Sequence, residues 1–151
     1  MLKRTCIFVA TLTFLVVLGL PLAQAQSNNL MIVHVPFDFY VRDQMMPAGA
    51  YRITALTDDG ATLLIRSEDG REAIAVLTNG AAAKRRQPDA PHLVFNRYGE
   101  QSFLISAWRD AKNGRELNQS QRERSLRREL AQAGRAVAPE VVNIAADTNG
   151  N

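Results

Sequence analysis

The chain has 151 residues, of which 46% are hydrophobic and 22% are charged, and its formal net charge is +3. This length is enough for one domain and too short for two domains with separate cores. The sequence contains a single cysteine, which excludes an internal disulfide.

The first 25 residues have the pattern of a secretory signal peptide. Lys3 and Arg4 form a short positive start, Cys6–Leu22 is almost wholly apolar, and small residues follow at Ala23 and Ala25. This order predicts cleavage after Ala25 and export to the periplasm or the exterior. The alternative is a retained membrane anchor, because the apolar run is at the lower limit of what spans a bilayer. The small residues at the cleavage site favour the signal peptide, and no stable membrane span is expected after its removal.

Removal of residues 1–25 changes the chemistry of the chain. It takes away Cys6 and two basic residues, so the mature protein lacks cysteine and is nearly neutral. The mature protein therefore cannot be a thiol enzyme or a cysteine-ligated metal protein, and its stability must come from core packing. Its near-neutral charge and its export both argue against nucleic acid as a partner.

The segment 26–117 is predicted to be a β domain. All aromatic residues of the mature chain lie between Phe37 and Trp108, which places the expected core there. Apolar and polar residues alternate at a period of two, as is typical of strands. The predicted strands are Leu30–Val35, Phe37–Arg42, Tyr51–Ala55, Ala61–Ser67, Arg71–Thr78, His92–Tyr98 and Phe103–Trp108.

Glycine-containing turns separate these strands and predict a meander of hairpins. The expected fold is mainly β: a small antiparallel barrel or sandwich of six to seven strands with one C-terminal α-helix. A long connection, Thr78–Pro91, carries the basic run Lys84-Arg85-Arg86. We interpret it as a solvated, protease-sensitive loop, with an anion-contacting loop as the alternative.

The segment 118–134 is predicted to be an amphipathic, arginine-rich helix. Ser120 and Glu123 fit a capping box and Gly134 fits the residue after a helix end, so the helix is expected over 121–133. Its apolar stripe is thin, so it should dock on the sheet or bind a partner. Glu123 is expected to pair with Arg127 one turn later. The predicted partner contact consists of four arginines, Arg122, Arg124, Arg127 and Arg128.

The remaining residues, 135–151, are predicted to be a flexible C-terminal tail. They end in a polar stretch rich in glycine and asparagine. A further strand at Val141–Ile144 is the alternative.

Two short segments carry a resemblance to other proteins. Val35–Val41 reads V-P-F-D-F-Y-V, and Pro47–Ile53 reads P-A-G-A-Y-R-I. This order resembles a group of small uncharacterised bacterial exported proteins, in which a signal peptide is followed by V-P-F-D-F and P-A-G-x-Y. Met46 stands where that group usually has leucine. The resemblance implies an exported β domain and implies no catalytic residue.

No catalytic, cofactor-binding or metal-ligating residue is predicted. His34 and His92 are the two histidines, and neither stands in a hydrolase or metal-binding motif. The acidic pairs Asp58–Asp59 and Glu68–Asp69 each precede a glycine, and we interpret them as turn-forming residues.

Three hypotheses about function follow. The first is a non-catalytic binding or structural module of the bacterial envelope or exterior, which contacts an envelope protein or an acidic surface through the arginine-rich helix. The second is an extracytoplasmic enzyme acting on glycan or peptide. The third is a small-ligand carrier with a barrel cavity. Tyr40, Tyr98 and Trp108 are interpreted as strand packing, with a ligand groove as the alternative.

Overall fold

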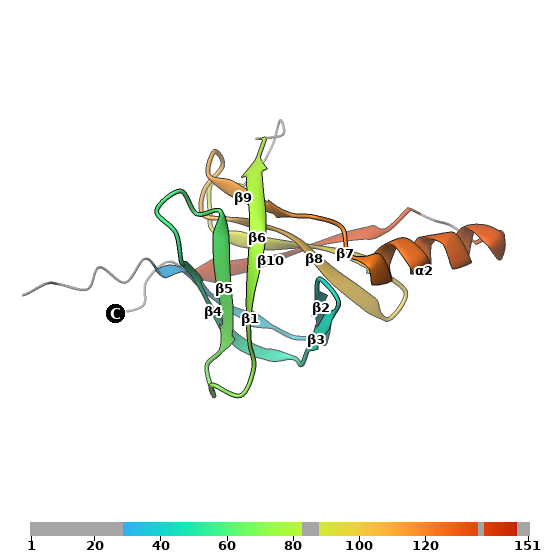
Figure 1. Ribbon diagram of the computed structural model, residues 1–151, viewed down its shortest axis with the longest axis horizontal. Coiled ribbons are helices and arrows are strands. Elements are labelled where there is room, and N and C mark those ends of the chain that lie inside the picture. Colours follow the sequence, from blue (N-terminus) through green and yellow to red (C-terminus); the bar gives the residue numbers. More distant parts are fainter. Residues whose placement is uncertain (1–28, 83–87, 136–137, 148–151) are drawn as a thin grey trace, which may run out of the picture.

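The computed structural model describes residues 29–82, 88–135 and 138–147 (Figure 1). The predicted signal peptide and the basic run of the long connection lie outside these ranges. Within them the chain forms ten strands and one helix. The strands are β1 (Asn29–Val35), β2 (Phe39–Val41), β3 (Gln44–Met46), β4 (Gly49–Ala55), β5 (Thr62–Ser67), β6 (Ala73–Ala81), β7 (His92–Tyr98), β8 (Gln101–Trp108), β9 (Gly114–Leu117) and β10 (Glu140–Asp147), and the helix is α2 (Gln121–Gln132).

Eight of these strands close into an antiparallel barrel. Their order is β7-β8-β9-β6-β5-β4-β1-β10, and each neighbouring pair is antiparallel. The other two strands, β2 and β3, form a hairpin that joins β8 by parallel pairing of Tyr40 with Phe103. The predicted mainly β fold with one C-terminal helix is therefore confirmed, and the barrel is the correct alternative.

The number of strands exceeds the predicted six to seven for local reasons. The predicted strand Phe37–Arg42 corresponds to β2, and β3 was not predicted, because the turn that leads into it at Arg42, with a φ of 59°, has no glycine to mark it. β9 was not predicted, since two of its four residues are charged. The prediction of a flexible tail is wrong for residues 140–147, and the alternative of a strand at Val141–Ile144 is confirmed: these residues belong to β10, between β7 and β1. Val141, Val142 and Ile144 give the strand pattern, and pairing with β7 extends the strand beyond them.

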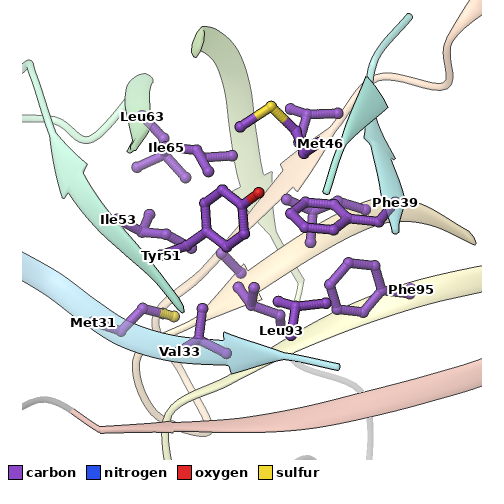
Figure 2. Close-up of a cluster of buried hydrophobic side chains, with 14 of the residues drawn as sticks. Met31, Val33, Phe39, Met46, Tyr51, Ile53, Leu63, Ile65, Leu93 and Phe95 are labelled. Atoms are coloured by element: carbon purple, nitrogen blue, oxygen red, sulfur yellow. The ribbon is translucent and has the colours of Figure 1, made fainter. Parts of the chain in front are cut away.

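Apolar side chains from all around the barrel fill its interior (Figure 2). Aromatic contacts organise one part of this core. The ring of Phe39 packs edge-on against Tyr51 and Phe95, with centroids 5.2 and 5.4 Å apart. The almost inaccessible side chains include Met31, Val35, Val41, Met46, Ile53, Leu63, Ile65 and Leu93.

The two segments that carry the sequence resemblance contact each other at the edge of this core. Asp38 Oδ1 accepts a hydrogen bond from the backbone N–H of Ala48 at 2.7 Å, and the hydroxyl of Tyr51 donates to the carbonyl of Pro47 at 2.6 Å. Burial, with the nearby charge of Glu72, raises the pKa of Tyr51 to about 12, so its hydroxyl remains a donor at neutral pH. These motif residues therefore have structural roles.

β8 is buried on both sides, and the hairpin β2–β3 continues the sheet beside it. The register of β7 and β8 shifts after Val94, which leaves Ile105 without a cross-strand partner. On one side of β8, Leu104 and Ala107 join the core. On the other side, the ring of Phe103 stacks with Tyr40 at 5.2 Å. A second layer thus extends from the barrel toward the start of α2.

Gly114 at the start of β9 should be intolerant of any side chain. A Cβ atom there would lie 2.6 Å from Cδ2 of Trp108. We expect Gly114→Ala to lower the free energy of unfolding by about 1–3 kcal/mol through overpacking. Chemical denaturation followed by Trp108 fluorescence measures this effect.

Gly80→Ala in β6 is the matched control, because a Cβ atom at Gly80 meets nothing within 4 Å. Equal stability of the two variants would show that Trp108 does not pack over Gly114 as described.

Candidate functional site

The first turn of α2 joins the helix to the barrel. Ser120 is the N-cap residue, and its hydroxyl oxygen accepts a hydrogen bond from the backbone N–H of Glu123 at 3.0 Å. The Glu123 side chain is only 2% exposed, and its Oε1 accepts from Asn96 Nδ2 at 3.0 Å and from the hydroxyl of Tyr98 at 3.1 Å. The predicted N-cap is confirmed. The predicted pairing of Glu123 with Arg127 is wrong, because the carboxylate is turned toward β7.

Tyr98 of β7 is a stable hydrogen-bond donor to this buried carboxylate. Burial raises the pKa of Tyr98 to about 12, and the negative charge of Glu123 contributes to the same rise. The hydroxyl therefore stays protonated and donates to Glu123 across the neutral range. The ring of Tyr98 also packs edge-on against Phe103, with centroids 6.0 Å apart.

Arg122 provides a second attachment of α2. Its backbone N–H donates to Asp43 Oδ1 at 3.0 Å, and its guanidinium carbon lies 4.3 Å above the ring centroid of Tyr40. A guanidinium group placed above an aromatic ring is attracted to it by a cation–π interaction. Arg122 thus holds the helix to the hairpin β2–β3 and differs in role from the other arginines of α2.

Beyond its first turn, α2 extends away from the barrel (Figure 1). Leu126 and Leu130 are only partly buried and, with Tyr98 and Arg97, line a groove of about 560 Å³ beside β7. The helix ends where the predicted glycine stands: Gly134 has a φ of 64°, and the N–H of the next residue donates to the carbonyl of Leu130 at 3.0 Å. The barrel thus covers the apolar stripe of α2 only in part.

Three arginines gather on an exposed face of α2. Arg124, Arg127 and Arg128 border a shallow surface depression of about 290 Å³, together with Gln119 and Ala131. Arg124 Nη1 donates to the carbonyl of Gln119 at 2.9 Å. In the described part of the chain the ion pairs involve other arginines, Arg71 and Arg109.

The spacing of these three arginines lowers the stability of the isolated helix. Arg127 and Arg128 follow Arg124 by three and four residues, and like charges at these separations destabilise a helix by about 0.2–0.5 kcal/mol per pair. A bound acidic group would remove this repulsion. We refer to Arg124, Arg127 and Arg128 as the arginine face.

The structure places the two histidines on different strands. His34 is exposed on β1, whereas His92 on β7 is buried. The ring of His92 stacks against Trp108 at 6.2 Å, and its Nδ1 lies 2.8 Å from the carbonyl oxygen of Ala90. The structure therefore does not bring the two histidines together.

The acidic pairs form turns, as predicted. Gly60 and Gly70 follow them with φ values of 66° and 73°. A hydrogen bond from the backbone N–H of Ala61 lowers the pKa of Asp59, and one from the hydroxyl of Ser67 lowers the pKa of Asp69. Both carboxylates thus stabilise the hairpins in which they lie.

The three aromatic residues singled out in the sequence have separate roles. Tyr40 lies between Arg122 and Phe103, and Tyr98 binds Glu123 beside the groove of α2. Trp108 is buried, and its Nε1 donates to the hydroxyl of Ser106 at 2.9 Å. They do not form one ligand groove.

Sequence reasoning missed the residues that receive α2. No sequence pattern marked Asp43 or Asn96, because each forms a hydrogen bond with a residue of α2 that lies far along the chain. The spacing of Ser120 and Glu123 did mark the helix start. It could not show that the glutamate side chain binds β7.

No family model, curated protein or solved structure matches this chain. The candidate site is therefore defined by its geometry: a helix fixed at its first turn, with an arginine face and a partly exposed apolar stripe.

Removal of the Glu123 carboxylate should destabilise the protein. Glu123→Ala leaves the donors of Asn96 and Tyr98 without their acceptor, and we expect a loss of about 1–3 kcal/mol in the free energy of unfolding. Glu129→Ala, at an exposed position of the same helix, is the control and should change stability by no more than about 0.5 kcal/mol. Denaturant titration of both variants decides the matter, and an equal effect would refute the anchoring role of Glu123.

Proposed function

We propose that this chain is an exported, non-catalytic binding module of the bacterial envelope or exterior, which holds an acidic surface of a partner through α2. The observation that carries the proposal is the position of the helix. α2 is attached at its first turn through Glu123 and Arg122, and its arginine face stands in solvent.

The chemistry of the arginine face favours carboxylate or phosphate oxygens. A guanidinium group presents several N–H donors in a planar fork and binds such anions through paired hydrogen bonds. Arg124, Arg127 and Arg128 lie within one turn, so they can contact one acidic surface together. An envelope protein with an acidic patch is the class of partner that fits, and no cofactor is required.

The apolar stripe of α2 gives the partner a second contact. Leu126 and Leu130 line the groove next to the barrel and are only partly buried. A helix of this length is marginal in water unless an apolar face is covered. A partner that filled the groove would stabilise the helix and bury these leucines.

The proposal of export rests on the sequence. Residues 1–25 combine a basic start, an apolar run and the small residues Ala23 and Ala25, which is the pattern of a cleaved signal peptide. The described helix, α2, is not long and apolar enough to cross a membrane.

The two alternative functions have less in their favour. The carrier hypothesis requires an apolar cavity of at least about 300 Å³, and apolar side chains occupy the barrel interior (Figure 2). The enzyme hypothesis requires a convergent set of acid–base groups, and His34 and His92 lie apart on β1 and β7.

Charge reversal on α2 tests the binding proposal. The mature protein is immobilised and exposed to solubilised envelope extract, and the retained proteins are compared for wild type and for Arg124→Glu with Arg128→Glu. We expect the wild type to retain a specific partner that added salt releases, because contacts between exposed charges are screened. The double variant should lose that partner.

The control for net charge is Arg52→Glu with Arg66→Glu, two exposed arginines that lie opposite each other on β4 and β5. This control should retain the partner. Absence of a partner in the wild type, or equal retention by both double variants, would contradict the proposal.

The N-terminus of the secreted protein tests export. N-terminal sequencing of protein recovered from the periplasm or the culture medium should begin at Gln26, because cleavage is expected after Ala25. Protein that retains Met1 would show that the segment is not removed.

A further inference from the structure

The outer face of β4, β5 and β6 carries exposed apolar side chains. Strand pairing aligns Leu56, Thr62 and Leu77 in one row, because the N–H of Leu56 donates to the carbonyl of Thr62 at 2.9 Å and Thr62 is paired with Leu77. The side chains of Leu56 and Leu77 are 53% and 69% exposed. Both leucines therefore border the same residue, Thr62, on a surface that the described part of the chain leaves open.

The next row on this face extends the apolar surface. The same pairing aligns Thr54, Leu64 and Ala75, of which Leu64 is partly exposed and Ala75 is exposed. Residues two apart on a strand lie about 7 Å from each other, so Leu64 is a neighbour of the first row. We refer to Leu56, Leu64 and Leu77 as the leucine patch. Single exposed leucines are ordinary, whereas a contiguous patch indicates an interaction surface.

Opposite charges flank the leucine patch along the strands. At one end, the exposed residues Arg52 and Arg66 lie directly opposite each other on β4 and β5, and like charges in such positions destabilise a sheet. At the other end, the exposed residue Asp58 lies in the turn between the same two strands. None of the three belongs to an ion pair within the described residues. The face thus has a basic end and an acidic end that lack partners of opposite charge.

We propose that a second copy of this chain covers this face, with the two sheets packed against each other around a two-fold axis. The axis crosses the strands between the row of Leu77 and the row of Leu64, so each row packs against the other row of the second copy. The same rotation places Asp58 opposite Arg52 and Arg66 of the second copy, at both ends of the contact. Packed sheets of this kind keep their strands within about 30° of each other.

Charge complementarity is the reason to choose a second copy as the occupant. A two-fold axis across the strands keeps β4 over β4 and β5 over β5, so the acidic turn between these strands meets the two arginines that they carry. This contact relieves the repulsion between Arg52 and Arg66 while the leucine patch is buried between the sheets. A contact of this type uses the same surface on both copies and closes at the dimer.

The proposed interface lies across the barrel from α2 (Figure 1). In the closed order of the eight barrel strands, β5 is four strands from β7 in either direction, and α2 is attached to β7 through Glu123. The dimer therefore leaves both arginine faces in solvent. The proposal does not rest on the binding function of α2, and either can fail without the other.

An aspartate in the leucine patch tests the apolar part of the contact. Sedimentation equilibrium of the mature protein should show a dimer in the wild type. Leu77→Asp should raise its dissociation constant by about tenfold or more, because an unpaired charge would be buried between the sheets. Val141→Asp is the matched control, since Val141 is 59% exposed on β10 and lies outside the leucine patch. This control should dimerise as the wild type does.

Exchange of charges between the two ends tests the arrangement itself. Arg66→Asp and Asp58→Arg should each weaken the dimer, because each places like charges opposite each other across the interface. The double variant with both changes restores an opposite pair at each end and should dimerise more tightly than either single variant. The measurements are made at low salt, where contacts between exposed charges are least screened.

Three outcomes would overturn the proposal. They are a wild type that stays monomeric up to about 1 mM, equal dimerisation of Leu77→Asp and Val141→Asp, and a double charge variant no tighter than the single ones. Circular dichroism shows whether each variant is folded. If Leu77→Asp does not fold, the charge exchange decides alone.

Discussion

The buried carboxylate of Glu123 determines where α2 begins and which of its faces is exposed. The carboxylate accepts hydrogen bonds from Asn96 and Tyr98 of β7, and the N-cap hydroxyl of Ser120 holds the backbone of the same turn. Buried charges persist in proteins only when such partners satisfy them. Because these directional contacts lie at one end of the helix, the remaining turns extend into solvent and carry the arginine face with them.

The local parts of the fold could be predicted from the sequence, and the parts that depend on distant pairing could not. Alternating residues predicted most of the barrel strands, and Ser120 and Gly134 predicted the ends of α2. The turn at Arg42 has no glycine to mark it. For β10 the sequence offered a strand at Val141–Ile144 only as an alternative to a flexible tail, and the full strand depends on pairing with β7 over Glu140–Ala145. The barrel closes because β8 pairs with both β7 and β9. Short-range sequence patterns cannot predict such a double pairing.

The candidate site was predictable to a similar extent. The sequence placed the arginines on a thinly amphipathic helix, and Arg124, Arg127 and Arg128 do lie on an exposed face. It could not separate Arg122 from them, because the ring of Tyr40 that lies beneath its guanidinium belongs to a hairpin far earlier in the chain. Nor could it show that Glu123 binds Tyr98, which lies 25 residues away. Both contacts depend on the arrangement of β2 and β7 on the two sides of β8.

Titration of Tyr98 tests the anchoring role of Glu123 most directly. Tyrosinate absorbance is followed with rising pH in the wild type and in Glu123→Gln, and Tyr98→Phe identifies the Tyr98 signal. The pKa of Tyr98 should be about 12 in the wild type. Loss of the negative charge in Glu123→Gln should lower it toward the ordinary value of 10.0, with part of the rise kept because the ring remains buried. Tyr51, whose pKa is about 12 for reasons unrelated to α2, should not change. A Tyr98 pKa near 10 in the wild type, or one that Glu123→Gln leaves unchanged, would contradict the account.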